Sequence, residues 1–140
     1  MTTSYDEIAE NLSYLDDWEE RYAYLIQIGK ALPPLPETLR TETNRVQGCA
    51  SQVWLATSSG EGRDPVLTFQ GDSDALIVRG LVALAIALNS GKKASEIVAL
   101  DTFGTFDALG LKAHLSSQRS NGLRSMVARI KRDAETAALR

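Results

Sequence analysis

The sequence predicts an α+β fold in which a small antiparallel sheet of about three strands packs on helices. The chain has 140 residues, the usual size of one domain, and 44% of them are hydrophobic, so we expect a single domain over residues 1–140 with its own core. Two segments in the middle of the chain alternate between apolar and polar residues, as the strands of a hairpin do. The segments on both sides show the spacing of amphipathic helices.

Two helices are expected in the N-terminal quarter. Ser4-x-x-Glu7 has the form of a capping box and opens a short helix whose apolar face is formed by Ile8 and Leu12. Asp16-x-x-Glu19 is a weaker signal of the same kind and opens a second helix. The inward face of this second helix runs at spacings of three and four residues through Trp18, Tyr22, Leu25, Ile26 and Gly29.

Four residues over 33–36, Pro-Pro-Leu-Pro, end the second helix because proline cannot continue it. Residues 37–50 show no clear period and predict a loop that has room for one short strand. The hairpin follows, with strands over 52–57 and 65–70 and a glycine-containing turn between them.

A buried apolar helix is expected over 75–88, with helix-capping residues before it at Asp72-Ser73-Asp74 and a stop at Asn89-Ser90-Gly91. Two short helices are expected near 94–100 and 105–109. The last helix is expected over about 121–137, with an inward face of Leu123, Met126, Val127 and Ile130.

Charge and composition exclude several classes of function. The net charge is −3, and the basic residues near the C-terminus have no aromatic residues among them, so we expect no nucleic-acid partner. The first residues do not form a signal peptide, and the most apolar stretch, 75–88, is shorter than the roughly 20 residues that span a bilayer. We therefore expect no membrane association and a cytoplasmic location, where a thiol stays reduced.

The cysteine count limits the chemistry further. One cysteine excludes an internal disulfide and any all-cysteine zinc or iron–sulfur site within one chain, because such sites need about four thiolates. We expect no cofactor and no bound metal.

Cys49 is the candidate for chemistry. It follows Gly48, which permits a sharp turn of the backbone, and it lies where a loop meets a strand. A structural cysteine more often lies inside an apolar, periodic element. The residues alone leave two interpretations open, a reactive thiol and an inert one. A reactive thiol would also suit a small cysteine hydrolase or acyltransferase that uses His114 as its base, although a lone histidine in a connection is more often structural.

The segment 46–54, VQGCASQVW, resembles the signature of the SufE family, the sulfur acceptors that work with cysteine desulfurases. Three further blocks resemble the family in the right order, and together they cover nearly the whole chain. They are 18–22 with 28–33, 71–75 with 78–81, and 114–116 with 119–123. The chain departs from the family at Ser117-Gln118, where members often have Pro-Ser, and at Lys93-Ala94, where many have Thr-Pro.

This resemblance implies a SufE/IscU-like fold and an accessory, sulfurtransferase-like role rather than an enzyme in the strict sense. Cys49 would take sulfane sulfur from the persulfide of a SufS-like or CsdA-like cysteine desulfurase and thereby stimulate that enzyme. It would pass the sulfur to an iron–sulfur scaffold such as a SufBCD-like complex. The chemistry is thiol exchange, which needs one thiolate and no cofactor.

The resemblance also indicates which residues support the thiol. Gly48, Ser51 and Gln52 are expected to shape the loop, and Arg119 to supply a cation to the site or to a docking surface. We expect Cys49 to rest against apolar residues, with Trp54 as a candidate wall, and to swing out when the partner docks. A two-fold homodimer is a further expectation, since small proteins of this kind commonly form one.

Overall fold

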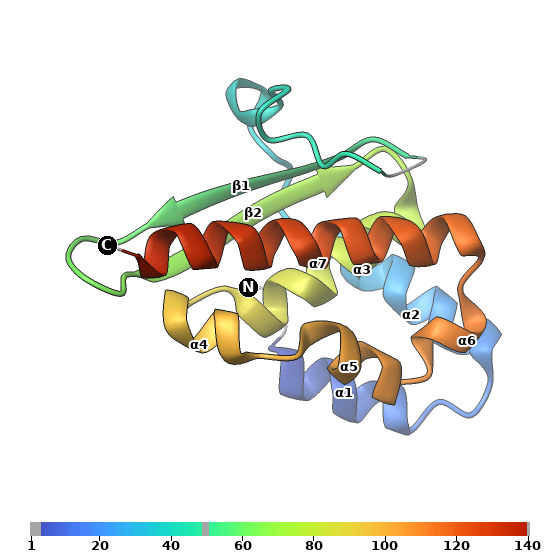
Figure 1. The fold of residues 1–140 in the computed structure, drawn as a ribbon. Helices are drawn as coiled ribbons and strands as arrows, with labels where there is room; N and C mark the ends of the chain where they lie inside the picture. Colours follow the sequence, from blue (N-terminus) through green and yellow to red (C-terminus); the bar gives the residue numbers. More distant parts are fainter. Residues whose placement is uncertain (1–3, 49–50, 140) are drawn as a thin grey trace.

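The computed structural model describes residues 4–48 and 51–139 and confirms the α+β fold (Figure 1). The strands form an antiparallel sheet in the order β1-β2-β3. In chain order the elements are α1 (Tyr5–Ser13), α2 (Trp18–Ala31), η1 (Glu37–Leu39), β1 (Val53–Ser59), β2 (Val66–Ser73), α3 (Leu76–Asn89), β3 (Lys92–Lys93), α4 (Ala94–Ala99), α5 (Thr102–Ala108), α6 (Leu111–His114) and α7 (Ser117–Ala138).

The two N-terminal helices begin close to the predicted positions. The hydroxyl of Ser4 accepts a hydrogen bond from the Glu7 backbone N–H at 3.3 Å, as the capping box predicted, and Ile8 and Leu12 are buried. The second helix begins one residue later than its signal, because the carboxylate of Asp17 accepts from the Glu19 N–H at 3.1 Å.

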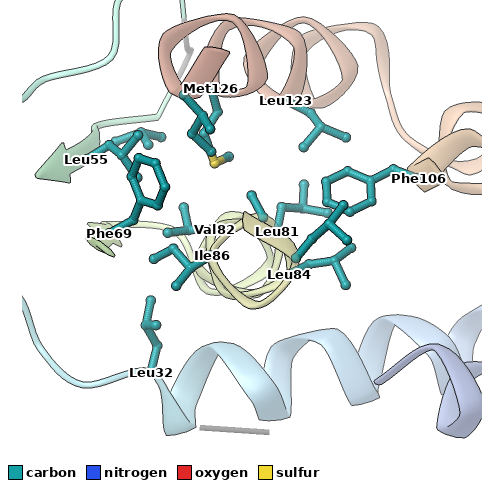
Figure 2. Packing of buried hydrophobic residues seen from close by; sticks show 14 of the residues in the cluster. Leu32, Leu55, Phe69, Leu81, Val82, Leu84, Ile86, Phe106, Leu123 and Met126 are labelled. Atoms are coloured by element: carbon teal, nitrogen blue, oxygen red, sulfur yellow. The ribbon is translucent and has the colours of Figure 1, made fainter. Parts of the chain in front are cut away.

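α3 forms the centre of the molecule, between the sheet, α2 and α7. Figure 2 shows its side chains Leu81, Val82, Leu84 and Ile86 surrounded by Leu55 and Phe69 of the sheet, Leu123 and Met126 of α7, Phe106 of α5, and Leu32. Burial on all sides explains why residues 75–88 are apolar almost without interruption. Two glycines let α2 and α3 touch through their backbones, since a Cβ on Gly29 would lie 2.6 Å from the Gly80 nitrogen.

The hairpin is longer than predicted, with Val53 paired to Ser73 at one end and Ser59 paired to Leu67 at the other. The third strand lies at Lys92–Lys93 and pairs with the start of β2. The sequence had left room for a short strand within 37–50, and that location was wrong. The described part of that segment contains η1 and a single bridge from Arg45 to Trp54.

The cap predicted for the apolar helix is wrong. Because β2 continues to Ser73, Asp72 and Ser73 belong to the strand, and α3 begins after Ala75 with no side chain capping it. The carboxylate of Asp74 accepts instead from the Gln52 N–H.

The last helix begins four residues earlier than predicted. Ser116 is its N-cap and accepts from the Arg119 N–H at 3.3 Å, so the residues of the expected connection at 117–120 are helical. The short helix α6 was also missed, and Gly110, at φ 81°, separates it from α5. Within the described ranges, no helix is both long and apolar enough to cross a bilayer.

Candidate functional site

Cys49 lies outside the described residues, as does Ala50, so the site is defined by the residues on either side of them. Gly48 precedes the cysteine and has a φ of 89°, a conformation that favours glycine. The position that a Cβ would take on Gly48 lies 2.6 Å from the Oγ of Ser125 on α7. The chain therefore reaches the cysteine while lying closely against the last helix.

The segment that leads to Gly48 is attached to both the sheet and α7. The Nη2 of Arg129 on α7 donates to the carbonyl oxygen of Thr43 at 2.8 Å. The Val46 N–H donates to the Val53 carbonyl oxygen, also at 2.8 Å, which extends the sheet by a few residues. These attachments fix the direction from which the chain enters the cysteine segment.

Asp72 secures the beginning of the same segment. It is 4% exposed, and its carboxylate lies 2.6 Å from Arg40 Nη2 and 2.8 Å from Arg79 Nε. It also accepts a hydrogen bond from the Leu35 N–H at 3.3 Å, while Arg79 donates to the Leu32 carbonyl oxygen. Two arginines are needed because an unpaired carboxylate is costly to bury. This aspartate of the Gly71–Ala75 block therefore holds residues 32–40 on the sheet.

The chain leaves the cysteine segment through a second attachment. The Gln52 N–H donates to Asp74 Oδ1 at 3.1 Å, and the Asp74 N–H donates back to the Gln52 carbonyl oxygen at 3.3 Å. Gln52 makes both contacts through its backbone, and its side chain is exposed. Gly48 and Gln52 thus mark two anchored points with only three residues between them.

A cavity of about 330 Å³ opens beside Ser51 and brings two of the predicted support residues together, Ser51 and Arg119. Its floor includes the buried side chains Leu81 of α3 and Leu123 and Met126 of α7. Figure 2 shows the two α7 side chains pointing toward α3. Its polar rim is formed by Ser51, Ser116, Gln118 and Arg119.

The electrostatics of this cavity favour an anion. The start of α7, at Ser116, brings the positive end of the helix dipole to the rim, and Arg119 adds a full positive charge. An anionic sulfur atom held here would be stabilised by both, while the apolar floor would exclude water. In the described part of the chain, no three acidic, cysteine or histidine side chains gather where they could hold a metal ion.

A larger cavity, about 490 Å³, lies between the end of α2, the start of α1, β2 and α3. Its lining is mainly apolar and includes neither Ser51 nor Arg119. We place the candidate site at the smaller cavity because only that one adjoins the cysteine segment.

Trp54 and His114 lie elsewhere. Trp54 is only partly buried and occupies the face of the sheet opposite to its neighbours Val53 and Leu55, with the guanidinium of Arg40 4.9 Å from its ring centre. It is not among the residues that line the cavity beside Ser51. His114 is exposed, and its ring stacks on Trp18 at 4.0 Å between ring centres. A Cys49–His114 pair involves a residue outside the described ranges and stays a hypothesis.

Sequence reasoning missed Ser116, Gln118 and Ser125 as site residues. Ser116 carried a signal, because serine is a preferred N-cap residue and its hydroxyl accepts from the N–H three positions later, at Arg119. Ser125 carried none, since a half-buried serine in a helix gives no indication of what it contacts.

The fold and the site together define a small α+β protein in which the one cysteine precedes the hairpin in the sequence and Ser51 lines an anion-favouring cavity. The chain belongs to the SufE family, because the family model described as "SufE: Fe-S metabolism associated domain" matches residues 6–134. Two SufE-like relatives, both named as uncharacterised, are similar over nearly their whole lengths. One from Rhizobium meliloti is 58% identical over 134 residues, covering 95% of this chain and 96% of the relative. One from Rhizobium etli is 59% identical over 136 residues, covering 96% of this chain and 92% of the relative.

The fold is shared with a solved structure, the solution structure of a hypothetical protein from Thermus thermophilus. The two match with a TM-score of 0.76 over 97% of this chain and 96% of that chain, at 18% sequence identity. Membership of the SufE family implies a sulfur-transfer accessory role in Fe–S metabolism, in interaction with cysteine desulfurases.

Proposed function

We propose that this protein accepts sulfane sulfur on Cys49 from the persulfide of a cysteine desulfurase and delivers it to an iron–sulfur assembly scaffold. By clearing the persulfide it stimulates the desulfurase. The observation that carries this proposal is the cavity lined by Ser51, where an apolar floor meets the positive start of α7. Ser51 is two positions along the sequence from Cys49, the only cysteine of the chain. The donor would be a SufS-like or CsdA-like enzyme, the acceptor a SufBCD-like complex, and the protein a two-fold dimer.

The first step is a thiol exchange. The Cys49 thiolate attacks the outer sulfur of the donor persulfide, the sulfur–sulfur bond of the donor breaks, and the donor cysteine leaves as a thiolate. Cys49 then carries the transferred sulfur as its own persulfide. Arg119 and the start of α7 stabilise the negative charge on sulfur before and after the exchange.

The second step repeats the same chemistry in the other direction. A thiolate of the acceptor attacks the outer sulfur of the Cys49 persulfide, and Cys49 is released as a thiolate. Between the two steps the apolar floor of Leu81, Leu123 and Met126 shields the persulfide from small thiols in solution.

A single cysteine suits this role. One thiolate per chain is too few to hold an iron–sulfur cluster, so a scaffold function does not fit. A second thiol close by would attack the carried persulfide and release its sulfur.

The test is the intact mass of the protein after incubation with a cysteine desulfurase and free cysteine. The proposal expects a gain of one sulfur atom that reduction removes and that Cys49→Ser does not show. An unchanged mass of the wild-type protein would overturn it.

A further inference from the structure

The third strand position of the sheet is filled along only part of β2. β2 runs from Val66 to Ser73, whereas β3 pairs with its first two residues, Val66 and Leu67. Beyond them, the hydroxyl of Ser90 accepts a hydrogen bond from the Phe69 N–H at 3.0 Å. The next part of β2 lines the larger cavity, so it forms an open edge of the sheet.

Backbone groups at this edge have no hydrogen-bond partner in the described part of the chain. The Leu55 N–H donates to the Asn44 carbonyl oxygen at 2.8 Å, on the side of β1 that faces away from β2. Because Leu55 stands opposite Gly71, the N–H and the carbonyl of Gly71 also point away from β1, as does the carbonyl of Phe69. No hydrogen bond joins these groups to any described residue. Gly71 is buried, and buried backbone groups are almost always paired.

The unpaired edge adjoins a cavity of about 490 Å³, a volume within the range of ligand sites. Its floor includes Ile86 and Ala87 of α3, and the small side chain of Ala87 leaves space there. The opposite wall includes Pro33 and Pro34, which have no N–H to offer the edge. Figure 2 shows Leu32, which also lines the cavity, pointing toward Ile86. The cavity is therefore a slot between β2 and the chain that follows α2.

We propose that this slot binds an extended segment of a partner protein, which adds a strand beside β2 in line with β3. In either direction, such a strand pairs with the N–H and carbonyl of Gly71 and with the carbonyl of Phe69. Its side chains alternate between the apolar floor and the side of the sheet on which Thr68 and Gln70 are exposed. The fitting sequence therefore alternates apolar and polar residues.

The unpaired backbone groups select a peptide as the occupant. A purely apolar molecule would cover the floor but leave the buried groups of Gly71 unpaired, which costs free energy. A second copy of this chain cannot pair through its own β2, because that edge lies equally recessed behind residues 31–34. The slot shares no lining residue with the cavity beside Ser51, so a bound segment leaves the candidate sulfur site open.

The experiment measures amide hydrogen exchange in the full chain, labelled with ¹⁵N, in the presence of the peptide acetyl-(Lys-Val)₃-amide. At a peptide concentration about ten times its dissociation constant, exchange of the Gly71 N–H should slow about tenfold. Two isomers of the peptide, N-methylated on the valines or on the lysines, are the matched controls. A strand presents alternate N–H groups to its neighbour, so one isomer should keep the effect and the other lose it. Unchanged Gly71 exchange with the parent peptide, or equal effects of the two isomers, would overturn the proposal.

A variant of the protein tests the slot itself. Ala87→Phe fills the floor and should abolish the effect of the peptide on Gly71, whereas Ala128→Phe, at an exposed position of α7, should retain it. An undiminished effect in Ala87→Phe would overturn the proposal, and if that variant does not fold, the two methylated peptides decide on the wild type. Ala87→Phe should still gain sulfur from a desulfurase, because this inference does not depend on the proposed sulfur chemistry.

Discussion

The carboxylate of Asp72 lies 2.6 Å from the guanidinium of Arg40 and so joins the end of β2 to the segment that leads to Cys49. Arg79 of α3 contacts the same carboxylate at 2.8 Å. Asp72 of β2 thus connects α3 to the segment that leads to Cys49.

Replacing Asp72 by asparagine should destabilise the protein strongly. Asparagine still accepts the hydrogen bond from Leu35, but Arg40 and Arg79 lose their shared counter-ion. Because both arginines are partly exposed, we expect a loss of about 3 kcal/mol in the free energy of unfolding, the lower end for a broken buried pair. Urea denaturation measures it.

The control for this prediction is Glu37→Gln, which removes the other carboxylate near Arg40. Glu37 is 93% exposed and 3.8 Å from Arg40, so its loss should change stability by less than about 0.5 kcal/mol. Equal losses of stability in the two variants would contradict the prediction, because the buried carboxylate of Asp72 would then stabilise the fold no more than the exposed carboxylate of Glu37.

Asp74→Ala should loosen the chain at Gln52, the residue at which it leaves the cysteine segment. The Gln52 N–H loses its side-chain acceptor, which we expect to lower stability by about 1 kcal/mol and to raise the rate of Cys49 with a thiol reagent. Asp74→Asn keeps an oxygen at the acceptor position and should behave like the wild type. A thiol rate that is the same in all three proteins would contradict the role given to this hydrogen bond.

Arg119→Gln should slow the acceptance of sulfur. The substitution removes the positive charge from the rim of the cavity, and for an exposed charge near a helix terminus we expect a decrease of about threefold. Arg119→Lys should retain most of the rate. Arg124→Gln, on the same helix but with its guanidinium over the ring of Phe103 at 4.3 Å, is the control and should have no effect. The rates are measured by quenching sulfur-transfer reactions at successive times and determining the intact mass of the protein.

His114→Gln separates the sulfur carrier from a cysteine hydrolase or acyltransferase. A hydrolase that uses His114 as its base loses its activity with this substitution. The carrier should keep its sulfur-loading rate within about threefold, because thiol exchange requires a thiolate and no dedicated base. Loss of sulfur loading in His114→Gln would contradict this prediction. It would give a chemical role to a histidine whose ring stacks on Trp18.

Asp64 should link stability to pH at the tip of the hairpin. Hydrogen bonds from the Ser95 hydroxyl and N–H hold the pKa of Asp64 below its ordinary value of 3.8. A carboxylate with a lowered pKa in the folded state stabilises that state above its unfolded pKa and loses this effect as the pH falls through the folded pKa.

The stability difference between the wild type and Asp64→Asn should therefore be constant near neutral pH and shrink below pH 3.8. Asparagine tolerates the positive φ of 47° at this position, so the substitution tests the charge and not the backbone. Urea denaturation across this pH range gives the result, and a difference that does not depend on pH would contradict it.

Local signals predicted the parts of the fold that depend on neighbouring residues. Ser4 and Glu7 are three residues apart, so the start of α1 could be predicted, and the alternation in the hairpin strands likewise marked β1 and β2. The end of β2 was harder to predict, because Asp72-Ser73-Asp74 looks like a helix cap until the pairing of Asp72 and Ser73 with Trp54 and Val53 is known.

The site was predicted only in part, because only some of its residues belong to a local sequence motif. Cys49, Ser51 and Arg119 stood out through the family's motifs, and the structure brings Ser51 and Arg119 to one cavity. The close approach of Gly48 to Ser125 brings together residues that are distant in the chain. Arg40, a partner of Asp72, is likewise 32 positions away from it. No local pattern encodes such contacts, so only the structure could provide them.

The most direct measurement of the central claim is the location of sulfur after transfer from a desulfurase supplied with isotopically labelled cysteine. Trypsin cuts after Arg45 and Arg63 and releases residues 46–63, the peptide that contains Cys49. The account predicts labelled sulfur as a persulfide on this peptide, and a desulfurase turnover that rises with the wild-type protein but not with Cys49→Ser. Peptide 46–63 without labelled sulfur, while the desulfurase is still stimulated, would contradict it.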